Sequence, residues 1–150
     1  MMISKIAPCL WFDGRAQEAA TFYVSLFPNA AIGAVSSHMV EFSLDGQRFQ
    51  ALNGGPQYKF SEAISLSIAC KDAAEVDHYW NGLLAHGGEE GRCGWLKDRF
   101  GVSWQVVPDG LGAVMSDPDP ERAGRAMQAM MGMKKLDLAA MRAAADGNTP

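Results

Sequence analysis

Glu41 is the carboxylate whose position in the chain most suggests chemistry. It lies in the run His38–Leu44, where apolar and polar residues alternate, so its side chain is expected on the opposite strand face from Val40 and Phe42. On such a face a carboxylate could act as a general base. A single carboxylate without a predicted partner could equally be a solvated residue at a sheet edge, and both interpretations stay open.

Three cysteines are the potential nucleophiles of the chain. Cys9, Cys70 and Cys93 are odd in number and have no Cys-x-x-Cys spacing. Free thiols in a reducing compartment are the simplest interpretation, and this predicts a cytoplasmic protein. A cysteine nucleophile remains the alternative.

Three histidines could act as metal ligands or proton carriers. His38 begins a predicted strand, whereas His78 and His86 lie in or at the end of a predicted helix, eight residues apart and therefore not on adjacent turns. Because the three are spread in this way, we expect them to be solvated surface residues.

Polar side chains also follow the predicted strands, on the faces opposite to the apolar residues. This set consists of Ser43, Asn53, Ser65, Ser67, Ser103 and Gln105. Hydroxyl and amide groups suit hydrogen bonding to a small molecule, and aromatic residues such as Phe49, Trp95 and Trp104 could stack on a planar ligand if they face inward. In the alternative interpretation, the amides of Asn53 and Gln105 bind no ligand and only form hydrogen bonds with neighbouring backbone groups. The predicted ligand-cavity residues are Asn53, Ser65, Ser67, Ser103, Gln105 and Phe49.

The stretch Cys93–Pro108 predicts a strand, a tight turn and a second strand. Asp98-Arg99-Phe100-Gly101 supplies the turn, because glycine adopts the positive φ that a chain reversal needs. In the last strand, apolar residues alternate with Ser103 and Gln105. The apolar side is expected to pack on helices, which directs Gln105 to the other side.

A duplication is hidden in the sequence. The apolar stripe of the first predicted helix recurs 57 positions later, where Phe22, Tyr23, Leu26 and Phe27 correspond to Tyr79, Trp80, Leu83 and Leu84. One strand-like segment precedes each helix, and further strand-like segments follow it. The sequence therefore predicts an α+β fold with two βαβββ modules, at about 3–56 and 60–108, within a single domain 1–150 that ends in a helical extension, 109–145.

The helical extension is rich in alanine and methionine. Glu121–Met133 and Leu136–Ala145 are predicted helices, and their methionines form a soft apolar surface. This surface could pack on the chain's own sheet, or it could provide a dimer contact or a lid over a pocket. Because one four-stranded sheet cannot enclose a cavity alone, modules must pair within one chain or between chains. We expect a homodimer.

Composition excludes several classes of partner. The chain has 150 residues and a net charge of −4, which argues against nucleic-acid binding and against a basic helix on a membrane surface. No apolar run reaches the roughly 18 residues that suggest a membrane span, and the N-terminal residues do not resemble a signal peptide. The expected partner is therefore a small molecule.

The duplicated unit, the Phe-Tyr-x-x-Leu-Phe-Pro helix end and the Asp-x-x-Gly turn together resemble the vicinal oxygen chelate superfamily, which includes glyoxalase I, extradiol dioxygenases, and bleomycin and fosfomycin resistance proteins. The segments 51–56, 62–65, 93–98 and 100–108 are similar to the PhnB-like subfamily, which is labelled 3-demethylubiquinone-9 3-methyltransferase. The resemblance covers about residues 3–145 and implies curved sheets of the glyoxalase/bleomycin-resistance type. In one departure, Ser36-Ser37 stands where similar proteins have a longer Gly/Pro-rich segment; a shortened loop and a missing loop are both possible.

The resemblance also implies a metal site in catalytic members, built from His, Gln and Glu side chains. The corresponding positions here are Pro8, Ala51, Ala63 and Gln105. Of these, Gln105 alone has a side-chain donor atom, whereas a catalytic zinc site takes three protein ligands. We therefore expect no metal.

The subfamily label implies a bound methyl donor, S-adenosylmethionine. Nucleotide-type cofactors usually sit on a glycine-rich turn from a strand into a helix. Gly54-Gly55 leads into Pro56 instead, and Gly87-Gly88 follows a helix. We therefore expect no cofactor.

Three functions from different classes follow from these observations. The leading hypothesis is a PhnB-like small-molecule-binding protein with a metal-free cavity. The first alternative is an enzyme, either a metal-dependent lyase or isomerase or the methyltransferase that the label names. The second alternative is a resistance-type protein that sequesters a drug.

Overall fold

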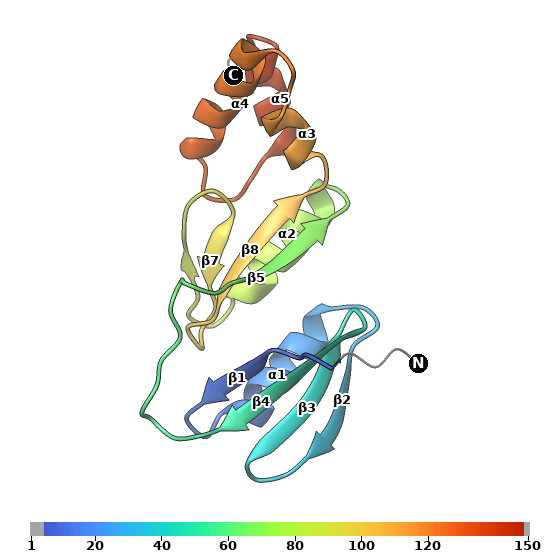
Figure 1. The fold of residues 1–150 in the computed structure, drawn as a ribbon, viewed down its shortest axis with the longest axis vertical. Coiled ribbons are helices and arrows are strands. Elements are labelled where there is room, and N and C mark those ends of the chain that lie inside the picture. Colours follow the sequence, from blue (N-terminus) through green and yellow to red (C-terminus); the bar gives the residue numbers. More distant parts are fainter. Residues whose placement is uncertain (1–4, 149–150) are drawn as a thin grey trace. The chain divides into compact units, whose positions relative to one another are not determined.

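The computed structural model describes residues 5–148 and begins with a βαβββ module (Figure 1). This first module consists of β1 (Cys9–Phe12), α1 (Ala16–Leu26), β2 (Ala31–Val35), β3 (Met39–Leu44) and β4 (Gln47–Asn53). Its sheet has the order β1-β4-β3-β2, in which β1 runs parallel to β4 and the other neighbours are antiparallel. α1 packs on one face, mainly against β3 and β4.

A second βαβββ module repeats this plan. It consists of β5 (Leu66–Cys70), α2 (Ala73–Leu84), β6 (Glu89–Glu90), β7 (Trp95–Lys97) and β8 (Ser103–Pro108). The sheet order is β5-β8-β7-β6, again with one parallel pair, β5 and β8. α1 begins at Ala16 and α2 at Ala73, which lie 57 positions apart. The predicted duplication and the α+β fold class are confirmed. The chain divides into two compact units between Phe60 and Ser61, and each is described by itself.

Alternation along the strands decides which side chains each helix covers. In β3, Val40, Phe42 and Leu44 are buried, whereas the residues between them are half-buried. α1 brings alanines to the sheet, and Ala16, Ala19 and Ala20 have no exposed surface. Small side chains let the helix backbone approach the strands closely, because nothing larger than a methyl group separates them.

Aromatic rings fill the core of the first module. Tyr23 of α1 stacks on Phe42 with 6.2 Å between ring centroids, and Phe42 stacks on Phe49 of β4 at 5.2 Å. Burying three such rings contributes several kcal/mol to the stability of the fold. The predicted helical stripe is thus confirmed at Tyr23, which is fully buried.

The core of the second module contains two tryptophans and a buried carboxylate. Trp80 of α2 is 4% exposed and Trp104 of β8 is 2% exposed. The indole Nε1 of Trp104 donates to Oδ2 of Asp98 at 2.9 Å. The other oxygen of Asp98 accepts from the backbone N–H groups of Phe100 and Val102, at 2.9 and 3.1 Å. The buried carboxylate of Asp98 therefore stabilises the predicted turn from Asp98 to Gly101 through these hydrogen bonds.

The two helices of the modules begin in different ways. Asp72 caps α2 by accepting from the backbone N–H of Glu75 at 2.9 Å, and aspartate is one of the residues most favoured at this position. Glu75 Oε1 accepts from the backbone N–H of Lys71 rather than from that of Asp72. α1 has no side-chain cap of its own. Its first N–H, from Ala16, donates instead to Asn53 Oδ1 on β4 at 2.9 Å.

The extension contains three helices rather than the two that the sequence predicts. They are α3 (Leu111–Met115), α4 (Pro120–Met131) and α5 (Leu138–Ala145). Arg125 of α4 donates to the carbonyl groups of Ala144 and Ala145 in the last turn of α5, where the carbonyl of Ala144 also accepts from the backbone N–H of Gly147. The methionines divide between core and surface: Met141 is fully buried, whereas Met131 is 57% exposed.

A tight turn links β2 to β3 in place of a long loop. The hydroxyl of Ser36 accepts from the backbone N–H groups of His38 and Met39 at 3.3 and 3.1 Å, and Ser36 N donates to Met39 O. A serine side chain thus replaces the glycine or asparagine that usually closes a short hairpin. None of the helices within residues 5–148 combines the length and the apolar character that a membrane span requires.

Candidate functional site

Each sheet has one face that its helix does not cover, which we call its open face. On the β5–β8 sheet, Gln105 is the cross-strand neighbour of Trp95 and lies in register with Ser67 of β5. Ser103 pairs with Lys97. Because Trp104 and Val106 are buried on the other side, strand alternation places these five residues together on the open face. The predicted orientation of Gln105, away from the helix, is thus what the structure shows.

Gln105 and two serines form the polar centre of the β5–β8 open face. Nε2 of Gln105 donates to the hydroxyl of Ser65, just before β5, at 2.9 Å. Ser103 is 2% exposed, and its Oγ is a buried polar atom with no hydrogen-bond partner in the described part of the chain. Buried hydroxyl groups nearly always have a partner, since an unpaired one costs about 1–3 kcal/mol. The unpaired hydroxyl of Ser103 is therefore an exception that calls for a structural or functional explanation.

An ion pair borders this polar centre. Nζ of Lys97 lies 2.7 Å from Oε1 of Glu62, and both side chains remain substantially exposed. The hydrogen bond from Lys97 lowers the pKa of Glu62, and the same bond raises the pKa of Lys97. Both groups therefore stay charged at neutral pH. Lys97 provides a positive charge next to Ser103, its partner on β8.

The open face of the β1–β4 sheet carries the other predicted residue with possible chemistry, Glu41. Its carboxylate lies 3.7 Å from Arg48 on the neighbouring strand, and Gln50 is its cross-strand partner. Ser43 pairs with Arg48 on the same face. Glu41 thus lies on the face that alternation predicts, beside the guanidinium of Arg48. Nothing in this arrangement assigns it a proton to transfer, and its role as a base stays a prediction.

Two of the predicted cavity residues lie elsewhere. Phe49 is 6% exposed and belongs to the helix-covered core, where it stacks on Phe42. Asn53 pairs in register with buried Phe12, and its amide links the first N–H of α1 to the carbonyl of Ser37. The amide of Asn53 therefore satisfies backbone groups, which was the alternative interpretation. Ser65, Ser67, Ser103 and Gln105, in contrast, belong to the open face of the second sheet or its border.

Sequence reasoning missed open-face residues on β4. Arg48, Gln50 and Leu52 face away from α1, because they alternate with Phe49 and the fully buried Ala51. The alternation of Arg48 and Gln50 with two apolar residues was a signal for this orientation. Trp11 also lies on this face of β1, in register with Leu52, and its indole Nε1 donates to the carbonyl of Gly55 at 2.8 Å.

The residues do not fit the metal site of the superfamily. Ala51 is fully buried beneath α1, Ala63 is exposed just before β5, and Pro8 precedes β1. Gln105 is the one position of the four with a side-chain donor, and its amide already bonds to Ser65. Within residues 5–148, no three His, Cys, Asp or Glu side chains come together in a way that could hold a metal ion.

The strand-to-helix turns do not fit a nucleotide-type methyl donor either. The turn before α1 contains one glycine, Gly14, and the turn before α2 is Lys71-Asp72, without any. A phosphate or nucleotide cradle needs several backbone N–H groups exposed at such a turn. The N–H groups at the start of α2 are instead capped by Asp72.

Two of the three cysteines, Cys9 and Cys70, are not activated for nucleophilic attack. Cys70 is fully buried, and burial raises its pKa to about 11. Burial also raises the pKa of Cys9, although that side chain lies at the exposed start of β1. A thiol needs a lowered pKa to react readily at neutral pH. All three cysteines are free, as predicted. His38, His78 and His86 are exposed, as predicted.

Comparisons with known proteins agree with this architecture. A family model described as 3-demethylubiquinone-9 3-methyltransferase matches residues 4–107. The PhnB protein from Bacillus cereus is similar in structure, with a TM-score of 0.65 and 29% sequence identity over 70% of this chain and 99% of that chain. No curated protein matches the chain.

Two further solved structures share the fold at lower identity. Protein PA1353 from Pseudomonas aeruginosa has a TM-score of 0.60 and 21% identity, over 71% of this chain and 98% of that chain. The fosfomycin resistance protein FosX from Listeria monocytogenes has a TM-score of 0.55 and 16% identity, over 72% of this chain and 91% of that chain. With the βαβββ duplication, the family match over residues 4–107 leads to one conclusion: the chain belongs to the PhnB-like family described as 3-demethylubiquinone-9 3-methyltransferase.

Proposed function

We propose that this PhnB-like protein binds a small polar organic molecule on the open face of the β5–β8 sheet, through side-chain hydrogen bonds and not through a metal ion. The observation that carries the proposal is the buried hydroxyl of Ser103, which has no hydrogen-bond partner within residues 5–148. A ligand oxygen that accepts from this hydroxyl would remove the cost of an unpaired buried group.

Neighbouring groups define the chemistry of the ligand. Gln105 bonds to Ser65 through Nε2, which leaves its carbonyl oxygen to accept from a ligand hydroxyl or amine. Trp95, the cross-strand neighbour of Gln105, is half-buried and offers an aromatic surface on the same face. The expected ligand therefore combines hydroxyl or carbonyl groups with a planar or apolar part, and Lys97 favours a partial negative charge on it.

The proposal covers binding and not methyl transfer. Methyl transfer would need a site for a methyl donor, and the turns before α1 and α2 lack the glycine-rich cradle for a nucleotide-type donor. Calorimetric titration with S-adenosylmethionine is expected to give no saturable heat. Saturable binding in that titration would favour the enzyme that the family description names.

A ligand screen by thermal shift, followed by calorimetry on each hit, tests the proposal. Gln105→Leu and Ser103→Ala are each expected to weaken binding by about tenfold, since each removes one hydrogen bond to a ligand in a shielded place. Ser25→Ala, which changes an exposed serine on α1, is the matched control and should leave affinity unchanged. If the affinity of each hit for Gln105→Leu and Ser103→Ala equals its affinity for the wild-type protein, a site on this face is refuted.

A further inference from the structure

The ion pair between Lys97 and Glu62 joins two parts of the second module that β8 separates. Lys97 belongs to β7, whereas Glu62 lies in the segment that leads into β5, and β8 lies between β5 and β7 in the sheet. The charged atoms of the two side chains are nevertheless only 2.7 Å apart. The two side chains therefore meet across the end of β8 at which Ser103 stands.

Ser103 lies in the row of residues that this ion pair spans. On one side its cross-strand partner is Lys97. On the other side Leu66 of β5 is level with Trp104, so Ser65 is level with Ser103. Ser103 is 2% exposed, and its hydroxyl has no hydrogen-bond partner within residues 5–148. An ion pair from Lys97 to the segment just before Ser65 thus extends from one side of this hydroxyl to the other.

Lys97 has a second carboxylate on its other side. Glu89 of β6 is its cross-strand partner, and residues paired in this way direct their side chains to the same face of the sheet. The hydrogen bond and the charge of Glu62 raise the pKa of Lys97, and the charge of Glu89 adds to this rise. Because β6 is the edge strand beyond β7, attraction to Glu89 draws Lys97 away from Ser103.

Neither pairing can hold Lys97 in one place. The side chains of Lys97 and Glu62 are 41% and 64% exposed, and Glu89 is exposed as well. An exposed ion pair shifts an equilibrium by at most about fivefold, because water and salt screen the charges. Lys97 is therefore expected to exchange between its two carboxylates at room temperature.

We propose that Lys97 gates the open face of the β5–β8 sheet by this exchange of partners. In the closed position Lys97 pairs with Glu62 across Ser103, whereas in the open position it pairs with Glu89 and leaves the hydroxyl accessible to a ligand. The inference rests on the proposed function, since Ser103 and Gln105 define the site that the gate controls. Lys97 stays on β7 in both positions, so its positive charge remains beside the ligand.

Thiol labelling measures the opening of the gate without any ligand. Ser103→Cys places a thiol at the gated position, and peptide mass mapping after reaction with iodoacetamide separates it from the three native cysteines. In this background, Glu62→Gln should raise the labelling rate about twofold to fivefold at low salt, because Lys97 loses its closed partner. Glu89→Gln should lower the rate, because Lys97 loses its open partner.

The opposite signs distinguish a gate from a general effect of charge. Glu62→Gln and Glu89→Gln each remove one negative charge near the thiol, so a change of local potential alone would alter both rates in the same direction. In 1 M salt, where the Debye length is about 3 Å, the rates should become nearly equal. Equal rates at low salt, or changes of the same sign in both variants, would overturn the proposal.

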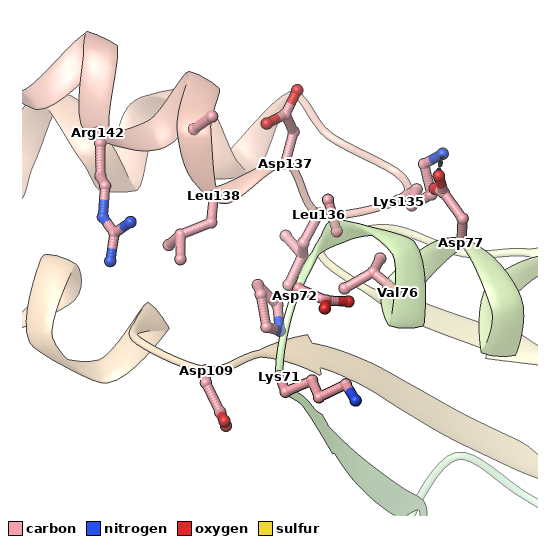
Figure 2. A pocket seen from close by; sticks show the side chains of 13 residues that line it. Lys71, Asp72, Val76, Asp77, Asp109, Lys135, Leu136, Asp137, Leu138 and Arg142 are labelled. Carbon is pink, nitrogen blue, oxygen red and sulfur yellow. Dashed lines mark hydrogen bonds and ion pairs between the residues drawn. The ribbon is translucent and has the colours of Figure 1, made fainter. Parts of the chain in front are cut away.

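The same unit contains a matched ion pair for the control. Lys135 and Asp77 border the cavity beside α5, a space of ≈ 560 Å³ between the second module and the helical extension (Figure 2). Figure 2 shows their side chains directed toward each other, from the chain that leads into α5 and from α2. They are 42% and 53% exposed, close to the values for Lys97 and Glu62. Asp77→Asn should leave the labelling rate unchanged, and a rise as large as that in Glu62→Gln would refute the gate.

NMR provides a second readout that leaves Ser103 intact. Nuclear Overhauser contacts between the side-chain protons of Lys97 and Glu62 are expected in the wild-type protein. In Glu62→Gln, contacts between Lys97 and Glu89 should become stronger, because Glu89 is then the remaining carboxylate partner. Contacts to Glu89 that do not strengthen in this variant would refute the exchange of partners.

Failure of the gate and failure of the proposed function give different results. If labelling follows the expected pattern but Gln105→Leu weakens the binding of no hit from the ligand screen, the gate is supported and the proposed site is wrong. If Gln105→Leu weakens binding while labelling is the same with and without Glu62→Gln, the site is supported and the gate is refuted.

Discussion

Replacement of Asp98 by alanine should destabilise the second module strongly, although Asp98 lies at a turn. Its carboxylate is 3% exposed and accepts from the indole of Trp104 and from the backbone N–H groups of Phe100 and Val102. An alanine leaves these three donors without that acceptor. Two of the three donor residues, Trp104 and Val102, are themselves buried, so water cannot readily replace the carboxylate there.

The magnitude follows from the number and burial of these donors. Each hydrogen bond to a charged group contributes about 1.5–3 kcal/mol, and the N–H of half-exposed Phe100 can recover part of this from water. We expect Asp98→Ala to lower the free energy of unfolding by about 3–5 kcal/mol. Asp98→Asn, which keeps one oxygen, should cost about 1–2 kcal/mol less than the alanine variant.

Urea unfolding followed by circular dichroism measures these changes, and a double-mutant cycle isolates the contact between the two side chains. Trp104→Phe removes the indole donor while it keeps a large ring. If the bond from Trp104 to Asp98 stabilises the fold, Asp98→Ala and Trp104→Phe together should cost less than the sum of the two single changes, by about 1–2 kcal/mol. Strict additivity, or an unfolding midpoint for Asp98→Ala equal to that of the wild type, would show that the carboxylate does not hold the turn.

Three further predictions concern the core, the metal and the oligomeric state. Trp80→Ala should lower the free energy of unfolding by about 3–5 kcal/mol, because Trp80 is 4% exposed within α2, and an unchanged unfolding midpoint would contradict its place in the core. Purified protein after dialysis should carry well under one equivalent of Zn, Ni, Fe or Mn by elemental analysis; a retained stoichiometric metal would refute this, and Glu41 would be the first ligand to test. The chain should form a homodimer in light scattering, since Met127 and Met131 leave apolar surface exposed, and a monomer mass at high concentration would exclude it.

Local patterns in the sequence were sufficient for the architecture. The recurrence of the Tyr23 stripe at Trp80 predicted the duplication, because each helix must bury one apolar stripe on its own sheet. Alternation in β3 predicted that Phe42 faces the helix and Glu41 the open side. The cap of α2 by Asp72 was equally predictable, since it depends on residues that lie three positions apart in the chain.

Tertiary structure decided the composition of the site. Asn53 and Gln105 are both amides on last strands of their modules, yet Asn53 caps α1 while Gln105 faces outward. The sequence of β4 has apolar residues on both faces, so alternation alone did not exclude Asn53 from the cavity. Its role became visible only when the parallel pairing of β1 with β4 placed it beside the first N–H of α1.

The cavity beside α5 shows the same limit at longer range. Nothing local relates Lys71 to Arg142, which are separated by most of the second module and the extension. The hydrogen bonds from Cys93 and Gly94 to Met133 and Lys134 fold the extension back onto the module and bring the two cations to one lining. Neighbours in the sequence determine which face of a strand or helix a side chain occupies. Its contact partners on other elements depend on backbone hydrogen bonds between segments that are far apart in the chain.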